Sequence, residues 1–175
     1  SVTLCDVSHM GEIDFIGPGA LSLVQKIATN DASKLAVNQA MYSAMCAEDG
    51  NVIDDLVCMR LGEDHFRWVV NVTKTEEDYH HILRHAHDLD VKVSNLSTDT
   101  ALMALQGPKS LEVLQRITKA DLSSLQYYAL IQTTIHTEHA EVPVIISRTG
   151  YTGERGYEIM LDRDRAPWVW DELLM

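Results

Sequence analysis

The stretch GPGALSLVQKI at residues 17–27 returns ninety residues later as GPKSLEVLQRI at residues 107–117. Both copies keep the glycine–proline pair, the leucine four places after the glycine, and a final glutamine, basic residue and isoleucine. Apolar residues follow each proline at helical spacing, and proline favours the first turn of a helix. The repeat therefore predicts an internal duplication of one folding unit. The match continues at the same offset in three further pairs: Asp31 and Asp121, Ser33 and Ser123, Leu35 and Leu125.

The residues around the first copy indicate what this unit contains. MGEIDFI at 10–16 alternates like a strand, and the motif follows it as a helix that ends near residue 28. Three strands come next, with an EDGN hairpin signal between the first two, and a helix with an acidic first turn completes the unit. The ranges predicted for these four elements are 39–46, 51–60, 66–72 and 74–88.

This order of elements predicts the fold class. Hairpin-linked strands with flanking helices are typical of the α+β class with antiparallel sheets, and they argue against a Rossmann arrangement. We expect two similar, ferredoxin-like subdomains, at residues 1–92 and 93–175. The alternative is that two common helix starts resemble each other by chance.

The composition is that of an ordinary globular protein with an acidic balance. The chain has 175 residues, 46% of them hydrophobic, which is enough to bury a core without disulfides. A formal net charge of −12 argues against a nucleic-acid partner, although a few local groups can still hold a small anion. Three distant cysteines without a CxxC motif favour free thiols in a reducing cytosol. We expect no membrane-spanning helix and no signal peptide.

Two neighbouring acids, Asp54 and Asp55, interrupt the predicted strand NVIDDLVCMR at 51–60. Neighbouring side chains on a strand point to opposite faces, so one of the two acids faces inward. A buried carboxylate is costly unless a ligand or a partner needs it, which makes this pair a candidate functional site. The alternative is an edge strand on which both acids are solvated.

A glycine-rich stretch, RTGYTGERGYEI at 148–159, is the second candidate. It lacks the GK[ST] signature and the following helix of a phosphate-binding loop. Glu158 then lies between apolar residues of the strand YEIM, which repeats the oddity of Asp55. The alternative is a long hairpin loop without a ligand.

Two further clusters carry less weight. DVSHM at 6–10 places Ser, His and Asp too close in sequence for a catalytic triad, whose members come from separated segments. The helix stretch HHILRHAH at 80–87 has no HExxH pattern, so we expect a solvated helix face and no metal site.

Taken together, the motifs resemble one family. The chain is similar to the aminomethyltransferase of the glycine cleavage system, the T-protein family, over essentially its whole length. The resemblance is carried, in the family's order, by LCDVSHMGEI, TND, MYS, DGNVIDDLV, VVNVT, ALQGP and SRTGYTGERGYEI. A related iron–sulfur-linked folate-binding protein has a cysteine in the loop that reads GYTGERG here, so the absence of cysteine argues against that member.

The resemblance implies a reaction and its residues. A one-carbon unit passes from an aminomethyl-lipoyl arm on the carrier H-protein to tetrahydrofolate, and ammonia is released. Asp55 is implied as the key carboxylate beside the folate nitrogens, and Glu158 as the residue that binds the pterin ring. Tyr42, Asn71 and Tyr151 match further folate-binding positions. A carboxylate that accepts two N–H donors suits a pterin edge, and tyrosines offer stacking faces.

The resemblance also sets expectations for the architecture. The two subdomains would surround a folate cavity that Asp55 faces, with Asp54 on the other side of the sheet. Members of the family carry a segment before DVSHM and a C-terminal β domain after the second subdomain, and neither is in this sequence. We therefore expect a fragment, cut at both ends, that can be inactive alone.

Departures from the family pattern leave alternatives open. Asn51 and Arg155 stand where the family usually has glycine and an acid. The motifs describe the folate site rather than the one-carbon donor, so the folate domain of another folate-dependent demethylase or dehydrogenase fits as well. A non-catalytic folate-binding module is the third alternative. The expected location is the cytoplasm, or the mitochondrial matrix in a eukaryote.

Overall fold

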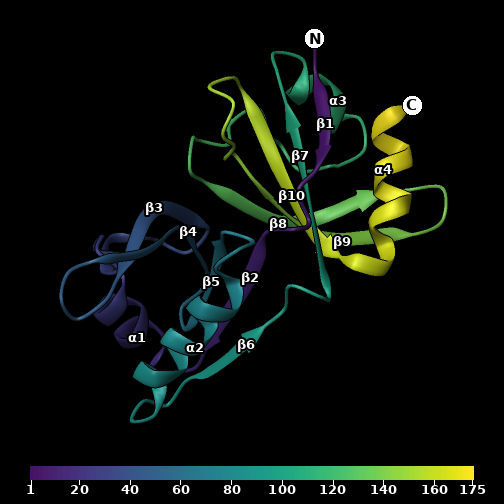
Figure 1. Ribbon diagram of the computed structural model, residues 1–175. Coiled ribbons are helices and arrows are strands. Elements are labelled where there is room, and N and C mark those ends of the chain that lie inside the picture. The colour runs from purple at the N-terminus through teal and green to yellow at the C-terminus, as the bar shows by residue number, and fades with distance from the viewer. The chain divides into compact units, whose positions relative to one another are not determined.

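The computed structural model describes residues 1–175, which form two compact units. The first unit comprises residues 10–97, and the second unit combines residues 1–9 with residues 98–175. Each unit contains one five-stranded antiparallel sheet together with its own helices (Figure 1). The predicted α+β class with two similar antiparallel-sheet subdomains is confirmed. No helix has both the length and the apolar character needed to cross a membrane.

In the first unit the strand order is β3–β4–β5–β2–β6. The strands are β2 (Gly11–Ile16), β3 (Gln39–Cys46), β4 (Val52–Gly62), β5 (His65–Val70) and β6 (Lys92–Asn95). Two α-helices and a short 3-10 helix accompany the sheet: α1 (Ala20–Ile27), η1 (Ala32–Lys34) and α2 (Thr75–Ala86). The core of the unit lies on one face of the sheet, where Phe15 and Trp68 pack with ring centroids 4.9 Å apart.

In the second unit the strand order, read in the matching direction, is β8–β9–β10–β7–β1. The strands are β1 (Thr3–Asp6), β7 (Thr100–Gln106), β8 (Leu130–His136), β9 (Glu141–Ser147) and β10 (Gly156–Asp162). The helices are α3 (Ser110–Gln115), η2 (Arg163–Arg165) and α4 (Ala166–Leu174). Leu105, Leu114, Tyr157 and Val169 belong to the buried cluster of this unit.

The two sheets repeat one topology, as the internal duplication predicts. The first four strands of the first sheet, β3, β4, β5 and β2, correspond in order to β8, β9, β10 and β7 of the second. The glycines of the repeated motif make equivalent hydrogen bonds. Gly17 N donates to Asp64 O over 2.9 Å, and Gly107 N donates to Arg155 O over 2.7 Å; both acceptors directly precede corresponding strands, β5 and β10. Two chance helix starts would not share a sheet topology, so the duplication is the better interpretation.

The outer strand of each sheet is exchanged between the repeats. β1 precedes the first repeat in sequence but pairs with β7 of the second, and β6 precedes the second repeat but pairs with β2 of the first. The serines that follow these strands behave alike, because Ser8 Oγ accepts from Leu102 N and Ser97 Oγ accepts from Glu12 N, both over 3.0 Å. The compact units therefore differ from the predicted 1–92 and 93–175 division by these two strands.

Element ends differ from the predicted ranges by a few residues. The first helix begins at Ala20 with Gly19 as its N-cap, so Pro18 precedes the helix instead of lying in its first turn. The strand predicted at 66–72 ends at Val70, because Asn71 turns its backbone and side-chain amides to a neighbouring strand.

Candidate functional site

The paired acids of β4 point to opposite faces of the sheet, as alternation predicts. Asp54 shares the face of Leu56 and Cys58, which belong to the core beneath the helices, and only 7% of Asp54 is exposed. Asp55 lies on the other face and is exposed. The inward-facing carboxylate is thus Asp54. Because it is buried, it needs hydrogen-bond donors within the protein.

Asn71, just after β5, supplies these donors and binds both acids. Its backbone N donates to Asp54 Oδ2 over 3.0 Å, and its side-chain Nδ2 donates to Asp54 Oδ1 over 2.8 Å. The same Nδ2 lies 3.1 Å from Asp55 Oδ1 and 3.1 Å from the Asp55 carbonyl oxygen. Both oxygens of the buried carboxylate therefore have donors, which is what permits its burial.

Tyr42 supplies the second contact to Asp55. Its hydroxyl donates to Asp55 Oδ2 over 2.5 Å, while the residue as a whole is 50% exposed. The two oxygens of Asp55 thus accept from different residues, which fixes the plane of an exposed carboxylate. We call Tyr42, Asp54, Asp55 and Asn71 the Asp55 cluster. The structure brings together three of the five residues that the resemblance implied for folate.

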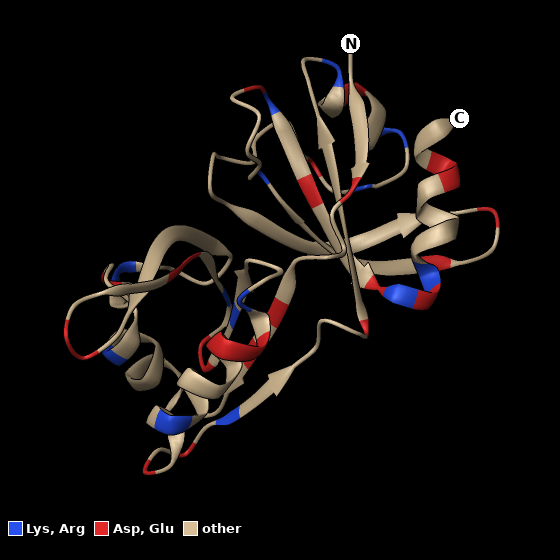
Figure 2. Cartoon of the chain, viewed as in Figure 1, with Lys and Arg blue, Asp and Glu red and all other residues tan.

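A further buried acid, Asp78, lies behind the Asp55 cluster in the acidic first turn of α2 (red in Figure 2). It is 0% exposed, and no hydrogen-bond donor reaches its carboxyl oxygens. Burial, as the largest cause, and the neighbouring Asp54 carboxylate together raise the pKa of Asp78 to about 8. Sequence reasoning missed this residue, because acids in a first helical turn are usually solvated and need no other explanation.

Glu158 on β10 is the centre of a second polar group, in the second unit. Thr149 Oγ1 donates to Glu158 Oε2, and the Thr149 and Ser147 hydroxyl oxygens are 2.7 Å apart. Burial raises the pKa of Glu158, and the Thr149 hydrogen bond opposes that shift. The carboxyl group is therefore largely removed from water with a single protein donor, so it can accept more.

The glycine-rich loop before β10 wraps the side chain of Gln106. Gln106 Nε2 donates to the carbonyl oxygens of Thr149 and Tyr157 over 3.2 and 3.1 Å. A Cβ atom on Gly150 or Gly156 would lie 2.3 or 2.2 Å from Gln106 Oε1, so a larger residue at either position would displace the Gln106 side chain. The ALQGP and RTGYTGERG motifs are thus parts of one structure.

A pocket of about 270 Å³ opens beside this loop. Tyr127, Arg148, Thr149 and Glu154 contribute to its lining. Tyr151, which the resemblance implied for folate, does not line the pocket, and its side chain is fully exposed at the tip of the loop.

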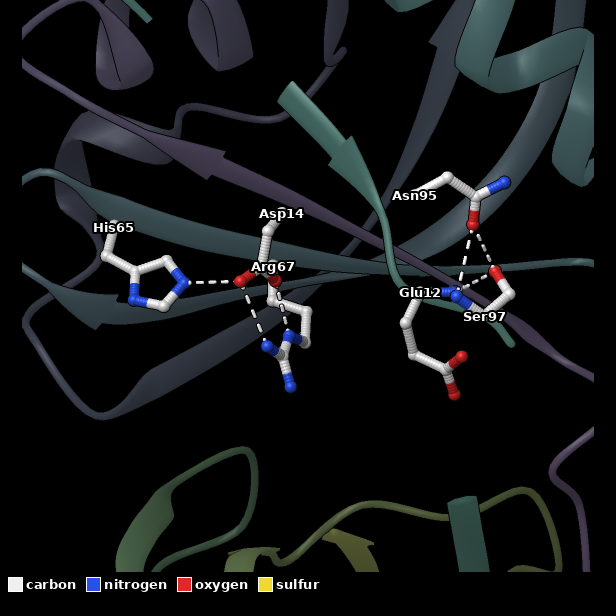
Figure 3. Close-up of polar contacts among 6 residues, drawn as sticks. All are labelled: Glu12, Asp14, His65, Arg67, Asn95 and Ser97. Atoms are coloured by element: carbon white, nitrogen blue, oxygen red, sulfur yellow. Dashed lines mark hydrogen bonds and ion pairs between the residues drawn. The ribbon is translucent and has the colours of Figure 1, made fainter. Parts of the chain in front are cut away.

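A third polar group lies on the same face of the first sheet as Asp55 (Figure 3). Asp14 accepts from Arg67 Nε over 2.5 Å, Arg67 Nη2 over 2.9 Å and His65 Nε2 over 2.8 Å. Burial alone would raise the pKa of Asp14, but these hydrogen bonds outweigh it and lower the pKa. Glu12, two residues away, is 0% exposed, its carboxyl oxygens have no hydrogen-bond partner, and burial raises its pKa to about 8.

The histidine-rich helix differs from its predicted solvated face at one position. His81 is only 5% exposed, and its ring lies 4.7 Å from that of His85. Burial lowers the pKa of His81, with the His85 and Arg84 charges acting in the same direction. No group of three or more His, Cys, Asp or Glu side chains has an arrangement that could hold a metal ion.

Comparisons with known proteins agree on one family. The model of the GCVT N-terminal domain matches residues 1–175. An aminomethyltransferase of Thermotoga maritima is 45% identical over 174 residues, which cover 99% of this chain and 47% of that protein. An aminomethyltransferase of Alkaliphilus metalliredigens is 46% identical over 171 residues, covering 98% and 46%. The chain thus spans about half the length of the curated relatives it matches.

Two solved structures have a similar fold. The glycine cleavage system aminomethyltransferase T of Bartonella henselae superposes with a TM-score of 0.87 at 30% identity, covering 99% of this chain and 45% of that one. The heterotetrameric sarcosine oxidase of Corynebacterium sp. U-96 shares the fold, with a TM-score of 0.72 at 20% identity over 98% of this chain and 83% of that one.

Proposed function

The chain belongs to the GCVT N-terminal domain family, and on that premise we propose that it is the folate-binding part of a glycine cleavage aminomethyltransferase. The reaction transfers a one-carbon unit from an aminomethyl-lipoyl carrier to tetrahydrofolate and releases ammonia. The partners are the lipoylated H-protein and tetrahydrofolate, and the role is glycine catabolism. The three free cysteines fit a reducing compartment, the cytoplasm or a mitochondrial matrix.

The observation that carries this proposal is the fixed carboxylate of Asp55. Tyr42 and Asn71 donate to different oxygens of Asp55, so the negative charge has one orientation in an exposed position. A preorganised anion stabilises positive charge that develops on a neighbouring carbon or nitrogen, without reorganisation during the reaction. Transfer of an aminomethyl carbon to an amine passes through such iminium or ammonium character. Asp55 is accordingly the catalytic residue of the proposal.

Glu158 supports the folate assignment. Its carboxyl group is mostly buried and has one protein donor, Thr149. A pterin presents an edge of N–H groups, and two of them suit the two oxygens of a carboxylate. Tyr42 offers an exposed aromatic face, and Tyr151 offers another at the loop tip. Asn71 serves by holding Asp55 in place.

The test is a pair of measurements on the natural full-length protein. Tetrahydrofolate is titrated by fluorescence or calorimetry, and methylenetetrahydrofolate formation is assayed with an aminomethyl-loaded H-protein. We expect binding together with turnover in the wild type, and binding without turnover in Asp55→Asn. Binding without turnover in the wild type would indicate a non-catalytic folate module. Turnover of sarcosine or dimethylglycine, and none with the loaded carrier, would assign another donor.

A further inference from the structure

Asp78 is a buried acid that the proposed reaction does not use directly. It lies in the first turn of α2, is 0% exposed, and receives no hydrogen bond on either carboxyl oxygen. An ionised carboxylate in such a place would be strongly disfavoured. The side chain therefore carries its proton, and a protonated acid is a hydrogen-bond donor in search of an acceptor.

The acceptor beside it is Asp54. Both Asp54 oxygens already accept from the backbone and side-chain amides of Asn71, an arrangement suited to an ionised carboxylate. The neighbourhood of the two carboxyls is one of the causes that lift the pKa of Asp78 to about 8. The other charged groups that act on Asp78 are Glu77, which raises its pKa, and Lys74, which lowers it without reversing the shift.

We propose that Asp78 is a positioning residue for the reaction: as a neutral acid it donates to Asp54, which holds Asn71 so that its amide reaches Asp55. The inference rests on the proposed function and deepens it, because it adds a buried layer to the same site. Asp78 touches no substrate in this scheme. It acts on the exposed carboxylate through two intermediate side chains.

The geometry explains why the buried layer matters. One amide nitrogen, Asn71 Nδ2, lies between Asp54 Oδ1 at 2.8 Å and Asp55 Oδ1 at 3.1 Å, so its position is a balance between two carboxylates. Donation from Asp78 offsets part of the Asp54 charge and lets Nδ2 serve Asp55. Ionisation of Asp78 would place two negative carboxylates, Asp54 and Asp78, side by side. Their combined charge would draw Asn71 Nδ2 toward them, and Asp55 would lose one of its two hydrogen-bond donors.

The test compares three variants of the natural full-length protein by kcat for aminomethyl transfer across pH 6–9.5. Asp78→Ala removes the donor, and we expect kcat to fall at least tenfold with little change in KM for tetrahydrofolate. Asp78→Asn keeps an N–H donor and cannot ionise. It should retain most of kcat at pH 7 and lack the decline above about pH 8 that we expect for the wild type. Glu76→Gln, at an exposed acid of the same helical turn that is not among the groups acting on Asp78, is the matched control and should keep the wild-type profile.

Two outcomes would overturn the inference. One is a folded Asp78→Ala protein, with the melting temperature of the wild type, that keeps wild-type kcat. The other is an alkaline decline that survives unchanged in Asp78→Asn. If Asp78→Ala does not fold, the Asp78→Asn profile decides. If the wild type transfers no aminomethyl group, the proposed function fails instead. The buried contact is then tested by carboxyl NMR, in which Asp54→Asn must lower the pKa of Asp78, and an unmoved pKa refutes the contact.

Discussion

Tyr42 and Asp55 are diagonal neighbours on β3 and β4, and the tyrosine hydroxyl donates to Asp55 Oδ2 over 2.5 Å. The directly paired residues are Tyr42 with Val57 and Ala44 with Asp55, so both side chains of the hydrogen bond lie on one face. Diagonal neighbours on a sheet are within reach of an aromatic side chain. The orientation of Asp55 is therefore set by a rigid ring on the next strand, which leaves the carboxylate little rotational freedom.

Asp55→Asn should abolish turnover and leave the fold intact. The substitution keeps the shape of an exposed side chain and removes its charge, so we expect kcat to fall about a hundredfold or more. Asp54→Asn should instead destabilise the first unit by about 1–3 kcal/mol, because an NH2 group would face an Asn71 donor in a buried site. Steady-state kinetics and thermal melts of both variants check this. Full turnover in Asp55→Asn would reverse our assignment of the two acids.

Glu158→Gln should weaken tetrahydrofolate binding by about 1.5–3 kcal/mol, the usual range for a hydrogen bond to a charged group. Calorimetric titration of the full-length protein measures this difference. Thr149→Val is a useful companion, since it removes the one protein donor to Glu158 while leaving the carboxylate. Equal affinities for wild type and Glu158→Gln would show that this glutamate does not touch the pterin. The isolated 175-residue chain should show a smaller effect, if its site is less well organised.

Glu12→Gln should stabilise the protein at neutral pH. Burial raises the pKa of Glu12 from 4.5 to about 8, so the folded state keeps a proton that the unfolded chain releases between these values. The stability of the wild type must then fall as pH rises from about 4.5 to 8. The glutamine variant lacks this contribution and should be more stable at pH 7.5 by about 1–3 kcal/mol.

Urea unfolding of wild type and Glu12→Gln at pH 5 and pH 7.5 measures this effect. The free energies of unfolding of the two proteins should differ little at pH 5 and clearly at pH 7.5. Glu112→Gln, at an exposed acid in α3, is the control and should leave the free energy of unfolding unchanged at both pH values. A Glu12→Gln protein with the wild-type pH dependence would mean that Glu12 is ionised when folded.

Gly156→Ala should destabilise the second unit by about 1–3 kcal/mol, because its Cβ would overlap the Gln106 side chain. Gln106→Ala alone should also destabilise, since it removes the hydrogen bonds that anchor the loop. The double variant should be less destabilised than the sum of the two, because the overlap no longer exists. Thermal melts of the four proteins form the cycle. Strict additivity would rule out the contact as the reason for glycine.

A polypeptide of residues 10–97 should fold better than one of residues 1–92. The first includes β6, the strand that completes the sheet at β2, whereas the second loses most of β6 and carries β1 without β7. Amide NMR spectra of the two polypeptides check this, with wide dispersion expected only for residues 10–97. Better dispersion for residues 1–92 would restore the boundary predicted from the sequence.

The duplication could be predicted from the sequence because its markers have a local cause. Gly17 and Gly107 both have positive φ, 134° and 125°, and a Cβ on either would lie within 2.7 Å of a carbonyl oxygen. Such a position accepts only glycine in any copy of the unit, so the motif persists. The exchange of β1 and β6 could not be predicted, because a strand of four residues is too short for its sequence pattern to indicate which sheet it joins.

The candidate site could be predicted only in its outer layer. Alternation placed Asp54 and Asp55 on opposite faces, and the exposed members of the cluster followed from motifs. The burial of Glu12 and Asp78 could not be predicted, because polar residues on one face of a strand or in a first helical turn are usually exposed to solvent. Their burial depends on which elements cover them, which is a property of the tertiary structure.

The exchanged strands also bear on synthesis. Proteins are synthesised from the N-terminus, so Thr3–Asp6 leaves the ribosome nearly a hundred residues before Thr100–Gln106, the strand with which it pairs. At cellular elongation rates this interval lasts roughly 5–20 seconds. Residues 10–97 can close their own sheet meanwhile, because its last strand is already made. During synthesis Thr3–Asp6 is therefore an unpaired strand until Thr100–Gln106 has been made, and its exposed backbone hydrogen-bonding groups are open to pairing with other chains in that interval.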